Sequence, residues 1–186
     1  QFIRRPMRQY VDRFFRAARL DVSLYQEVVA EPLLLNQAWI TVLLYAMLAS
    51  WGSFGRAGAV GSNIGMISAL IGWYIWAFSS YFIAARLFRG RPAETQRGDR
   101  KTVIRAMGFA CAPGVIRLLG MIPGLGIAVL VLSSVWMIIA ATIAIKVALN
   151  FESTAHAAGA CIFGWIIGAI TQGLLLVILF SVFGVS

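Results

Sequence analysis

The feature that most constrains this chain is an apolar run from Gly159 to Val185 that contains no charged side chain. A helix needs about 20 apolar residues to cross the hydrocarbon core of a bilayer, and this run exceeds that length. The whole chain has the same character, with 60% hydrophobic residues, only 12% charged residues and a mean hydropathy of +0.83. Because helices satisfy their backbone hydrogen bonds internally, we predict an all-α, polytopic transmembrane helical bundle.

Four other apolar runs extend this pattern to five predicted spans. The predicted spans are residues 33–51, 64–88, 103–121, 125–149 and 159–185. Asn36 is the expected N-cap of the first span. We therefore divide the chain into cytoplasmic amphipathic helices in residues 1–32 and a five-helix transmembrane domain in residues 33–186.

The third predicted span is irregular, because it carries Pro113 in its middle and Arg117 within the apolar run. Proline removes a backbone donor and clashes with the preceding turn, so we expect the helix to be broken or kinked there. The segment either spans the bilayer or forms a re-entrant hairpin, which would reduce the number of spans to four.

The N-terminal residues 2–19 place apolar side chains on one helical face and arginines on the other. We expect this helix to lie on the membrane surface, with its arginines reaching anionic lipid phosphates. The alternative is a helix that packs on the protein's own cytoplasmic loops or on a partner. A capping box from Ser23 to Gln26 then predicts a second short helix, which Pro32 ends. The predicted membrane-surface residues are Arg5, Arg8, Phe14, Phe15, Arg16 and Arg19.

Most basic residues lie on one side of the predicted spans. Six precede the first span, seven lie from Arg86 to Arg105, and Lys146 borders the next loop on that side. The opposite side receives Arg56 and Arg117. The positive-inside rule then places the N-terminus in the cytoplasm and the C-terminus across the cell membrane. Anionic headgroups, not nucleic acid, are the expected partner of the net charge of +9.

Several short motifs follow one another in a characteristic order. They are ARLDVSLYQEV at residues 18–28, NQA at 36–38, GFACAP at 108–113, LLGMIPGLG at 118–126 and VWM at 135–137. In this order the chain resembles the Yip1-domain family of membrane proteins in its bacterial form. The resemblance implies a five-helix membrane domain with a cytoplasmic N-terminus. Eukaryotic members act with small GTPases in membrane trafficking, whereas for bacterial members the resemblance implies a fold and no established chemistry.

The titratable side chains do not form a catalytic set. All seven acidic residues lie outside the predicted spans, His156 stands alone in a predicted loop, and no GxSxG, HExxH or P-loop motif occurs. Cys111 and Cys161 lie in apolar segments without a CxxC setting, so we interpret them as packing residues and expect no metal site. We predict no enzyme and no cofactor. The aromatic-rich spans neither require nor forbid a bound pigment or quinone.

Three residues of the broken segment, Arg105, Pro113 and Arg117, define a candidate intramembrane polar site. Interrupted helices line substrate sites in transporters, so a small-solute or anion transporter is the alternative function. No predicted span carries an acidic residue that could couple protons or cations. We therefore interpret Arg117 as a side chain that snorkels to the outer interface.

Two ridges of small residues, spaced four apart, lie in the predicted spans. Such ridges let helices approach closely, either within this bundle or between molecules. We predict a non-enzymatic membrane component that organises membrane or binds another membrane protein or a second copy of itself, including as an accessory subunit of an energy-transducing or transport complex. The ridges are Ala160, Gly164 and Gly168 in the last span, and Gly61, Gly65 and Ala69 in the second.

Overall fold

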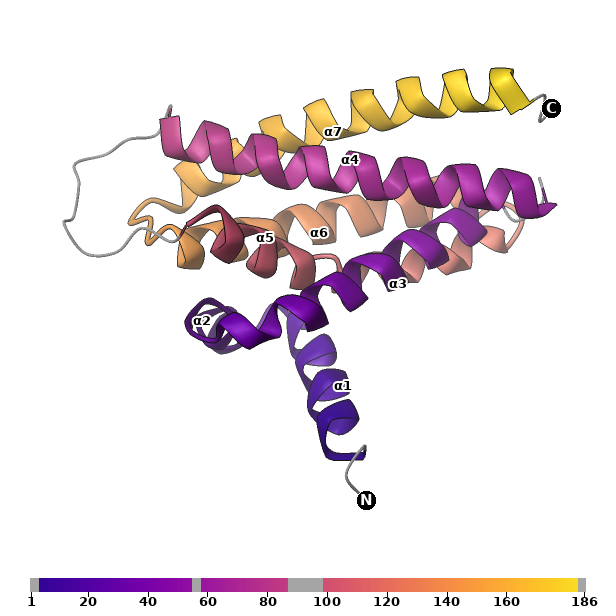
Figure 1. Cartoon of the computed structure of the whole chain (residues 1–186). Helices are drawn as coiled ribbons and strands as arrows, with labels where there is room; N and C mark the ends of the chain where they lie inside the picture. Colours follow the sequence, from indigo (N-terminus) through magenta and orange to yellow (C-terminus); the bar gives the residue numbers. More distant parts are fainter. Residues whose placement is uncertain (1–3, 55–57, 87–98, 184–186) are drawn as a thin grey trace.

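The computed structural model describes residues 4–54, 58–86 and 99–183, and the side chains of residues 4–6, 53 and 54 lie outside that description. Within these ranges every element of regular secondary structure is helical (Figure 1). Four helices are long and apolar enough to cross a membrane, and a bent pair of shorter helices raises the number to five if the pair forms one span. The predicted class, an all-α polytopic bundle with a short N-terminal helix, is confirmed.

Three short elements precede the first long helix, and α1 runs across the direction of the long helices (Figure 1). Asp21 caps α2 by accepting a hydrogen bond from the backbone N–H of Ser23 at 2.9 Å. The predicted capping box at Ser23 is therefore wrong, because Asp21, two residues earlier and an equally good N-cap, takes this role. Glu31 is the C-cap of α2 and precedes Pro32, as predicted. The three elements are α1 (Arg4–Ala18), α2 (Val22–Ala30) and the 3₁₀-helix η1 (Pro32–Leu34).

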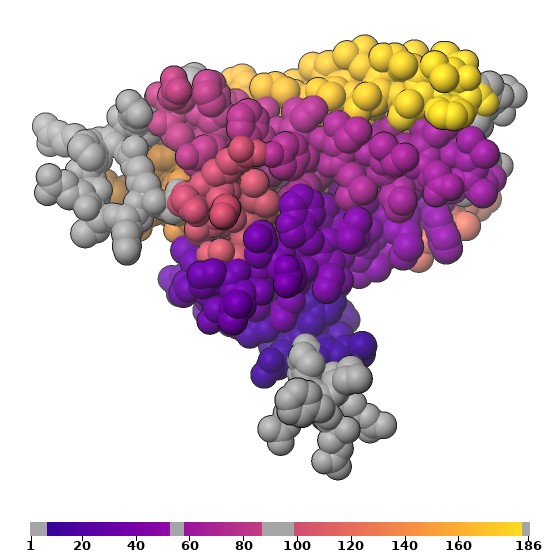
Figure 2. Space-filling view, in the orientation of Figure 1, coloured from indigo at the N-terminus to yellow at the C-terminus, as the bar shows by residue number. Residues whose placement is uncertain are grey.

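Five elements form a ring in the membrane domain. Around this ring α3 packs on α4, α4 on α7, α7 on α6, α6 on η3, and η3 on α3. Figure 2 shows α7 as the outermost layer on top of α4. The elements are α3 (Leu35–Phe54), α4 (Gly58–Arg86), the 3₁₀-helix η3 (Ala112–Met121), α6 (Gly126–Ala148) and α7 (Thr154–Phe183).

One end of the ring is filled by α5 (Arg100–Phe109), which packs against α2, α3 and α6. Tyr25 of α2 and Met107 and Phe109 of α5 are fully buried there. These large side chains close this end of the bundle with a dense core.

The broken third segment is present as predicted, because α5 and η3 meet at an angle of 43°. Pro113 lies in the first turn of η3, where its missing N–H costs no helical hydrogen bond. Asp99 begins α5 by accepting a hydrogen bond from the backbone N–H of Thr102 at 2.9 Å. The polar cap therefore starts the segment before the apolar run itself begins at Val103.

Several helix starts differ from their predicted positions. Leu35 continues directly from η1 into α3, so Asn36 lies inside the helix and is not its N-cap. Gly58 begins α4 within the stretch predicted as a loop, and Thr154 begins α7 within the predicted polar turn. His156 consequently lies exposed in the first turn of α7. Both α4 and α7 therefore begin before the apolar runs from which their spans were predicted.

The ridge of small residues in α7 contacts α4 of the same chain. A Cβ atom added to Gly164 would lie 2.2 Å from Ser80 Oγ and 2.8 Å from the Ser80 nitrogen. A Cβ atom added to Gly168 would lie 2.8 Å from the carbonyl oxygen of Gly72. The ridge could contact helices of this bundle or of another molecule, and in the structure Gly164 and Gly168 contact α4 of the same bundle. In α4, Gly61, Gly65 and Ala69 are buried.

Replacing Gly164 with alanine should destabilise the protein, because the new methyl group would overlap the α4 backbone. Overpacking of this kind costs about 1–3 kcal/mol. Thermal unfolding in a mild detergent should show a lower midpoint for G164A. The matched control is G173A, where an added Cβ meets nothing within 4 Å. Equal midpoints for the two variants would contradict the packing described here.

Candidate functional site

Arg117 of η3 points into the bundle and joins three elements. Its Nη1 donates to Tyr45 Oη of α3 at 2.8 Å, its Nε to Ser133 Oγ at 2.9 Å and its Nη2 to Ser134 Oγ at 2.9 Å. Its guanidinium carbon also lies 5.3 Å from the centre of the Tyr45 ring, within the range of a cation–π contact. The expectation that Arg117 snorkels to the outer interface is therefore wrong, because inward hydroxyl groups provide partners that lipid cannot.

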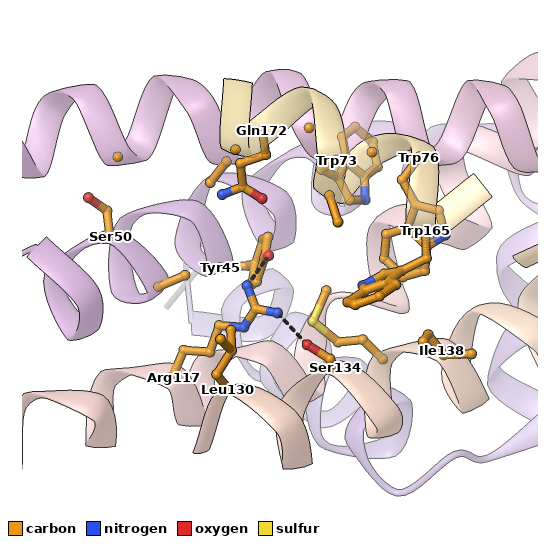
Figure 3. Close-up of a pocket in the computed structure, with 18 of the residues that line it drawn as sticks. Tyr45, Ser50, Trp73, Trp76, Arg117, Leu130, Ser134, Ile138, Trp165 and Gln172 are labelled. Carbon is orange, nitrogen blue, oxygen red and sulfur yellow. Dashed lines mark hydrogen bonds between the residues drawn. The ribbon is translucent and has the colours of Figure 1, made fainter. Parts of the chain in front are cut away.

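A cavity of about 570 Å³ adjoins this guanidinium, surrounded by α3, α4, α6 and α7. Figure 3 shows Arg117 on one side, Gln172 across from it, and the tryptophan side chains at one end. The lining is mainly apolar, with a few polar groups, as in most small-molecule sites. Its tryptophans are Trp73, Trp76 and Trp165.

No described residue that lines this cavity is acidic. The partners of Arg117 are neutral hydroxyl groups and one aromatic ring, so its positive charge is solvated by dipoles. In a medium of low dielectric constant, such a cation attracts an anion strongly. The arrangement can therefore bind a negative charge, but it offers no pair of groups for acid–base catalysis.

Close backbone contacts fix the position of η3. A Cβ atom on Gly52 would lie 1.9 Å from the carbonyl oxygen of Arg117, and one on Gly114 would lie 2.5 Å from the ring of Tyr45. Only glycine permits α3 and η3 to approach this closely. Pro113, which precedes Gly114, is fully buried. Pro113 and Gly114 thus position the arginine through the backbone and do not contribute polar groups.

Arg105 belongs to a different part of the molecule. It is 4% exposed, and it donates to the carbonyl oxygens of Val28 at 2.5 Å and Val29 at 2.8 Å. These carbonyls lie near the end of α2, where an arginine satisfies unpaired acceptors. Arg105 does not line the cavity beside Arg117. The structure thus separates the two arginines that we expected to form one anion site.

The predicted membrane-surface residues of α1 do not share one environment. Arg8, Phe15 and Arg19 are exposed, whereas Phe14 packs against the buried core. The side chain of Arg5 lies outside the description, as do Arg56 and residues 87–98 of the basic loop.

Arg16 is held by acidic residues. Its Nε bonds Asp21 at 2.8 Å and its Nη1 bonds Glu27 at 2.9 Å, while Arg13 also bonds Glu27 at 2.7 Å. Lipid phosphates would have to displace these carboxylates to reach Arg16. The network joins α1 to α2. Arg13 and Arg16 thus bind carboxylates of the protein itself, as expected for a helix that packs on its own chain.

Taken together, several candidate spans, a broken helix and an inward arginine define a polytopic α-helical membrane protein. The model of the Yip1 domain matches residues 19–185, so the chain belongs to the Yip1-domain family. Comparison with curated proteins and with solved structures gave no match. The family resemblance drawn from the order of motifs is confirmed.

Sequence reasoning missed the partners of Arg117 and the cavity beside it. Ser133 and Ser134 were visible as rare hydroxyl groups in an apolar span, and a polar group in a membrane needs a partner. That rule could have paired them with Arg117. Tyr45 is 72 residues away from Arg117, and no sequence signal connects the two.

The ion network between α1 and α2 predicts a dependence on pH. Hydrogen bonds from Arg16 and Ser23 lower the pKa of Asp21 from 3.8 to about 2. Burial alone would raise the pKa of Glu27, but the hydrogen bonds from Arg13 and Arg16 outweigh it and lower that pKa. Because both folded pKa values are depressed, the stabilisation is present above the ordinary carboxyl pKa and is lost as pH falls through the folded values.

Hydrogen–deuterium exchange of α1, corrected for intrinsic rates, should therefore show constant protection from neutral pH to about 4.5. Protection should then fall as the pH approaches 2. The D21N variant should exchange faster already at neutral pH. Protection that does not change with pH in either protein would contradict the role of this network.

Proposed function

We propose that this chain is a non-enzymatic Yip1-like component of a cell membrane that binds another membrane protein, and that it serves as an accessory subunit of a larger membrane complex. The observation that carries this proposal is the exposed outer face of the second half of α7. The family is generally non-catalytic, and the polar groups of the cavity provide no acid–base pair. We also infer that the chain is of the bacterial form of this family, from the order of its motifs.

The second half of α7 faces its neighbours with one side only and has no fully buried residue. Its buried residues all lie between Ala157 and Gly168, and none of the residues from Ala169 to Phe183 is buried. Only 6% of its most apolar stretch is buried, against 39–44% in the three other long helices. A span of a bundle normally covers one side of itself against its neighbours. In this half one face is half-buried, as at Gln172 and Leu176, whereas the opposite face stays exposed.

A helix of another membrane protein fits this half of α7 better than lipid alone. The face formed by Ile170, Leu174 and Ile178 is 56–60% exposed, and these residues follow the spacing of a helix–helix seam. Helices in membranes associate through van der Waals packing of such complementary faces. A partner helix would complete the layer that α7 begins on α4.

The alternative function, transport of a small solute or anion, has one observation in its favour, the inward Arg117 beside a cavity. None of the residues that line the cavity belongs to α2 or α5. Phe109, Cys111 and Met137 at that end are 0–2% exposed and close the interior. A transport path would need these side chains to separate, so the geometry favours binding over flux.

The direction of α1 supports the proposal of a helix on the membrane surface (Figure 1). This helix runs across the long helices, as a helix lying in a membrane surface would (Figure 1). Met7, Val11 and Phe15 form an exposed apolar stripe on it, 44–64% exposed. We infer a surface helix at the cytoplasmic face, with Arg8 and Arg19 facing anionic headgroups.

Site-specific crosslinking in the native membrane tests the partner. Cys111 and Cys161 are buried, so a cysteine introduced at an exposed position is the reactive one. We expect L174C, carrying a photoreactive group, to capture one distinct membrane polypeptide that also co-purifies at fixed stoichiometry in mild detergent. The control is L43C on α3, which is similarly exposed at 50% against 60%.

Two results would overturn the proposal. In the first, L174C and L43C give the same products, which would mean that lipid covers both positions. In the second, L174C captures only another copy of this chain.

A further inference from the structure

The geometry points to a ligand site that goes beyond the proposed function: the cavity beside Arg117 binds an anionic amphiphile. In this site a phosphate or carboxylate head meets the guanidinium, and a hydrocarbon chain lies among the tryptophans. A membrane phospholipid and a free fatty acid share this chemistry.

The charge of Arg117 is the first argument. A guanidinium carries five N–H donors, and its three described hydrogen bonds leave two of them for a ligand. Its described partners are neutral, so its charge lacks a counter-ion within the described residues. Arginine binds carboxylate and phosphate oxygens through paired N–H donors. An anionic oxygen group therefore supplies what the protein leaves open.

A second polar group in the cavity also lacks a partner. Trp73 is 3% exposed, and its Nε1–H makes no hydrogen bond of normal geometry in the described part of the chain. The thiol of Cys111, a weak acceptor, is its neighbour. Buried indole N–H groups usually find an acceptor. The indole nitrogen is itself buried, so a ligand oxygen would reach it only after a turn of the ring, whereas Gln172 already provides a polar side chain in the cavity wall (Figure 3).

The remaining wall and the rim of the cavity indicate the rest of the ligand. A volume of about 570 Å³ lies within the usual range of small-molecule sites and exceeds what a bare anion needs. Leu130, Val131 and Val135 of α6 line it and are 48–56% exposed, so the cavity opens between apolar side chains on the outside of the bundle. A ligand that arrives through such an opening comes from the hydrocarbon phase, which favours an amphiphile over a water-soluble anion.

Arg117 also joins α3, η3 and α6, but this structural role does not explain why a cavity lies beside it. Three hydroxyl partners could hold the arginine in a filled interior, as buried polar groups are held elsewhere. The experiment must therefore separate loss of ligand from loss of fold. Two variants do this, because one removes the charge and the other removes the space.

We would purify the protein in a mild detergent from a membrane of known lipid composition and weigh the intact protein with its bound lipids by native mass spectrometry. We expect one anionic lipid per chain, enriched over its share in the membrane. R117Q should lower the affinity for the lipid about tenfold or more, and thus its occupancy at limiting lipid, since a hydrogen bond to a charged group contributes about 1.5–3 kcal/mol. K101Q removes an exposed basic side chain of α5 that does not line the cavity, and it should leave occupancy unchanged.

The second variant is G173F, which places a ring at the rim of the cavity where an added Cβ meets nothing within 4 Å. It leaves Arg117 and its three partners intact and should reduce occupancy while the unfolding midpoint stays near that of the wild type. If R117Q unfolds, G173F alone decides the question.

The extracted lipid distinguishes the two sources, because phospholipid and fatty acid differ in mass. Either one, lost in G173F, supports the proposal. Bound lipid that matches the bulk membrane, or that persists in G173F, overturns it. Retention of added inorganic phosphate in place of a lipid also overturns it. These outcomes are independent of crosslinking at Leu174, so this proposal and the proposed function can fail separately.

Discussion

The fold depends on the need to provide partners for one cation inside an apolar bundle. Arg117 lies between α3 and α6, and its hydrogen bonds to Tyr45, Ser133 and Ser134 join the consecutive elements η3 and α6 to α3, which is distant in sequence. Without them, a guanidinium in this interior would carry a large desolvation cost. The break at Pro113 directs the arginine inward, and the glycines at 52 and 114 allow the backbone to approach. The geometry of the cavity follows from these contacts.

The contact between α4 and α7 has the opposite character, because it contains almost no polar interaction. Glycines bring the two backbones together over the first half of α7, and Trp76 adds a hydrogen bond from its indole N–H to the carbonyl oxygen of Cys161 at 3.0 Å. Beyond Gly168 no residue of α7 is buried. A firmly fixed first half thus presents a second half that other membrane components can contact.

The sequence was sufficient for the features that depend on local composition. Apolar runs predicted the long helices, and Pro113 predicted the break, because both follow from the cost of exposing backbone groups to lipid. Helix starts were less well predicted: Asp21 competes with Ser23 for the cap of α2, and Asn36 lies in a helix that η1 already begins. Propensity cannot decide between neighbouring candidates of similar strength.

The candidate site was predicted only in part. Arg117 was recognisable as unusual, but its direction depends on which helices surround it, and this information resides in contacts between distant residues. Arg105 and Arg117 are close in sequence and yet serve different elements, because the bend between α5 and η3 separates their surroundings. The neutral partners of Arg117 and the cavity beside it emerge only from the assembled ring.

The winding of η3 has a consequence for the reach of the broken segment. An α-helix rises about 1.5 Å per residue and a 3₁₀-helix about 2.0 Å. Ten α-helical residues in α5, followed at 43° by ten 3₁₀ residues in η3, advance about 30 Å along the axis of α5. With η3 wound as an α-helix, the same bend would leave the advance at about 26 Å. The tighter coil thus offsets the shortening caused by the bend and keeps the advance at about the 30 Å that a span needs to cross the hydrocarbon core.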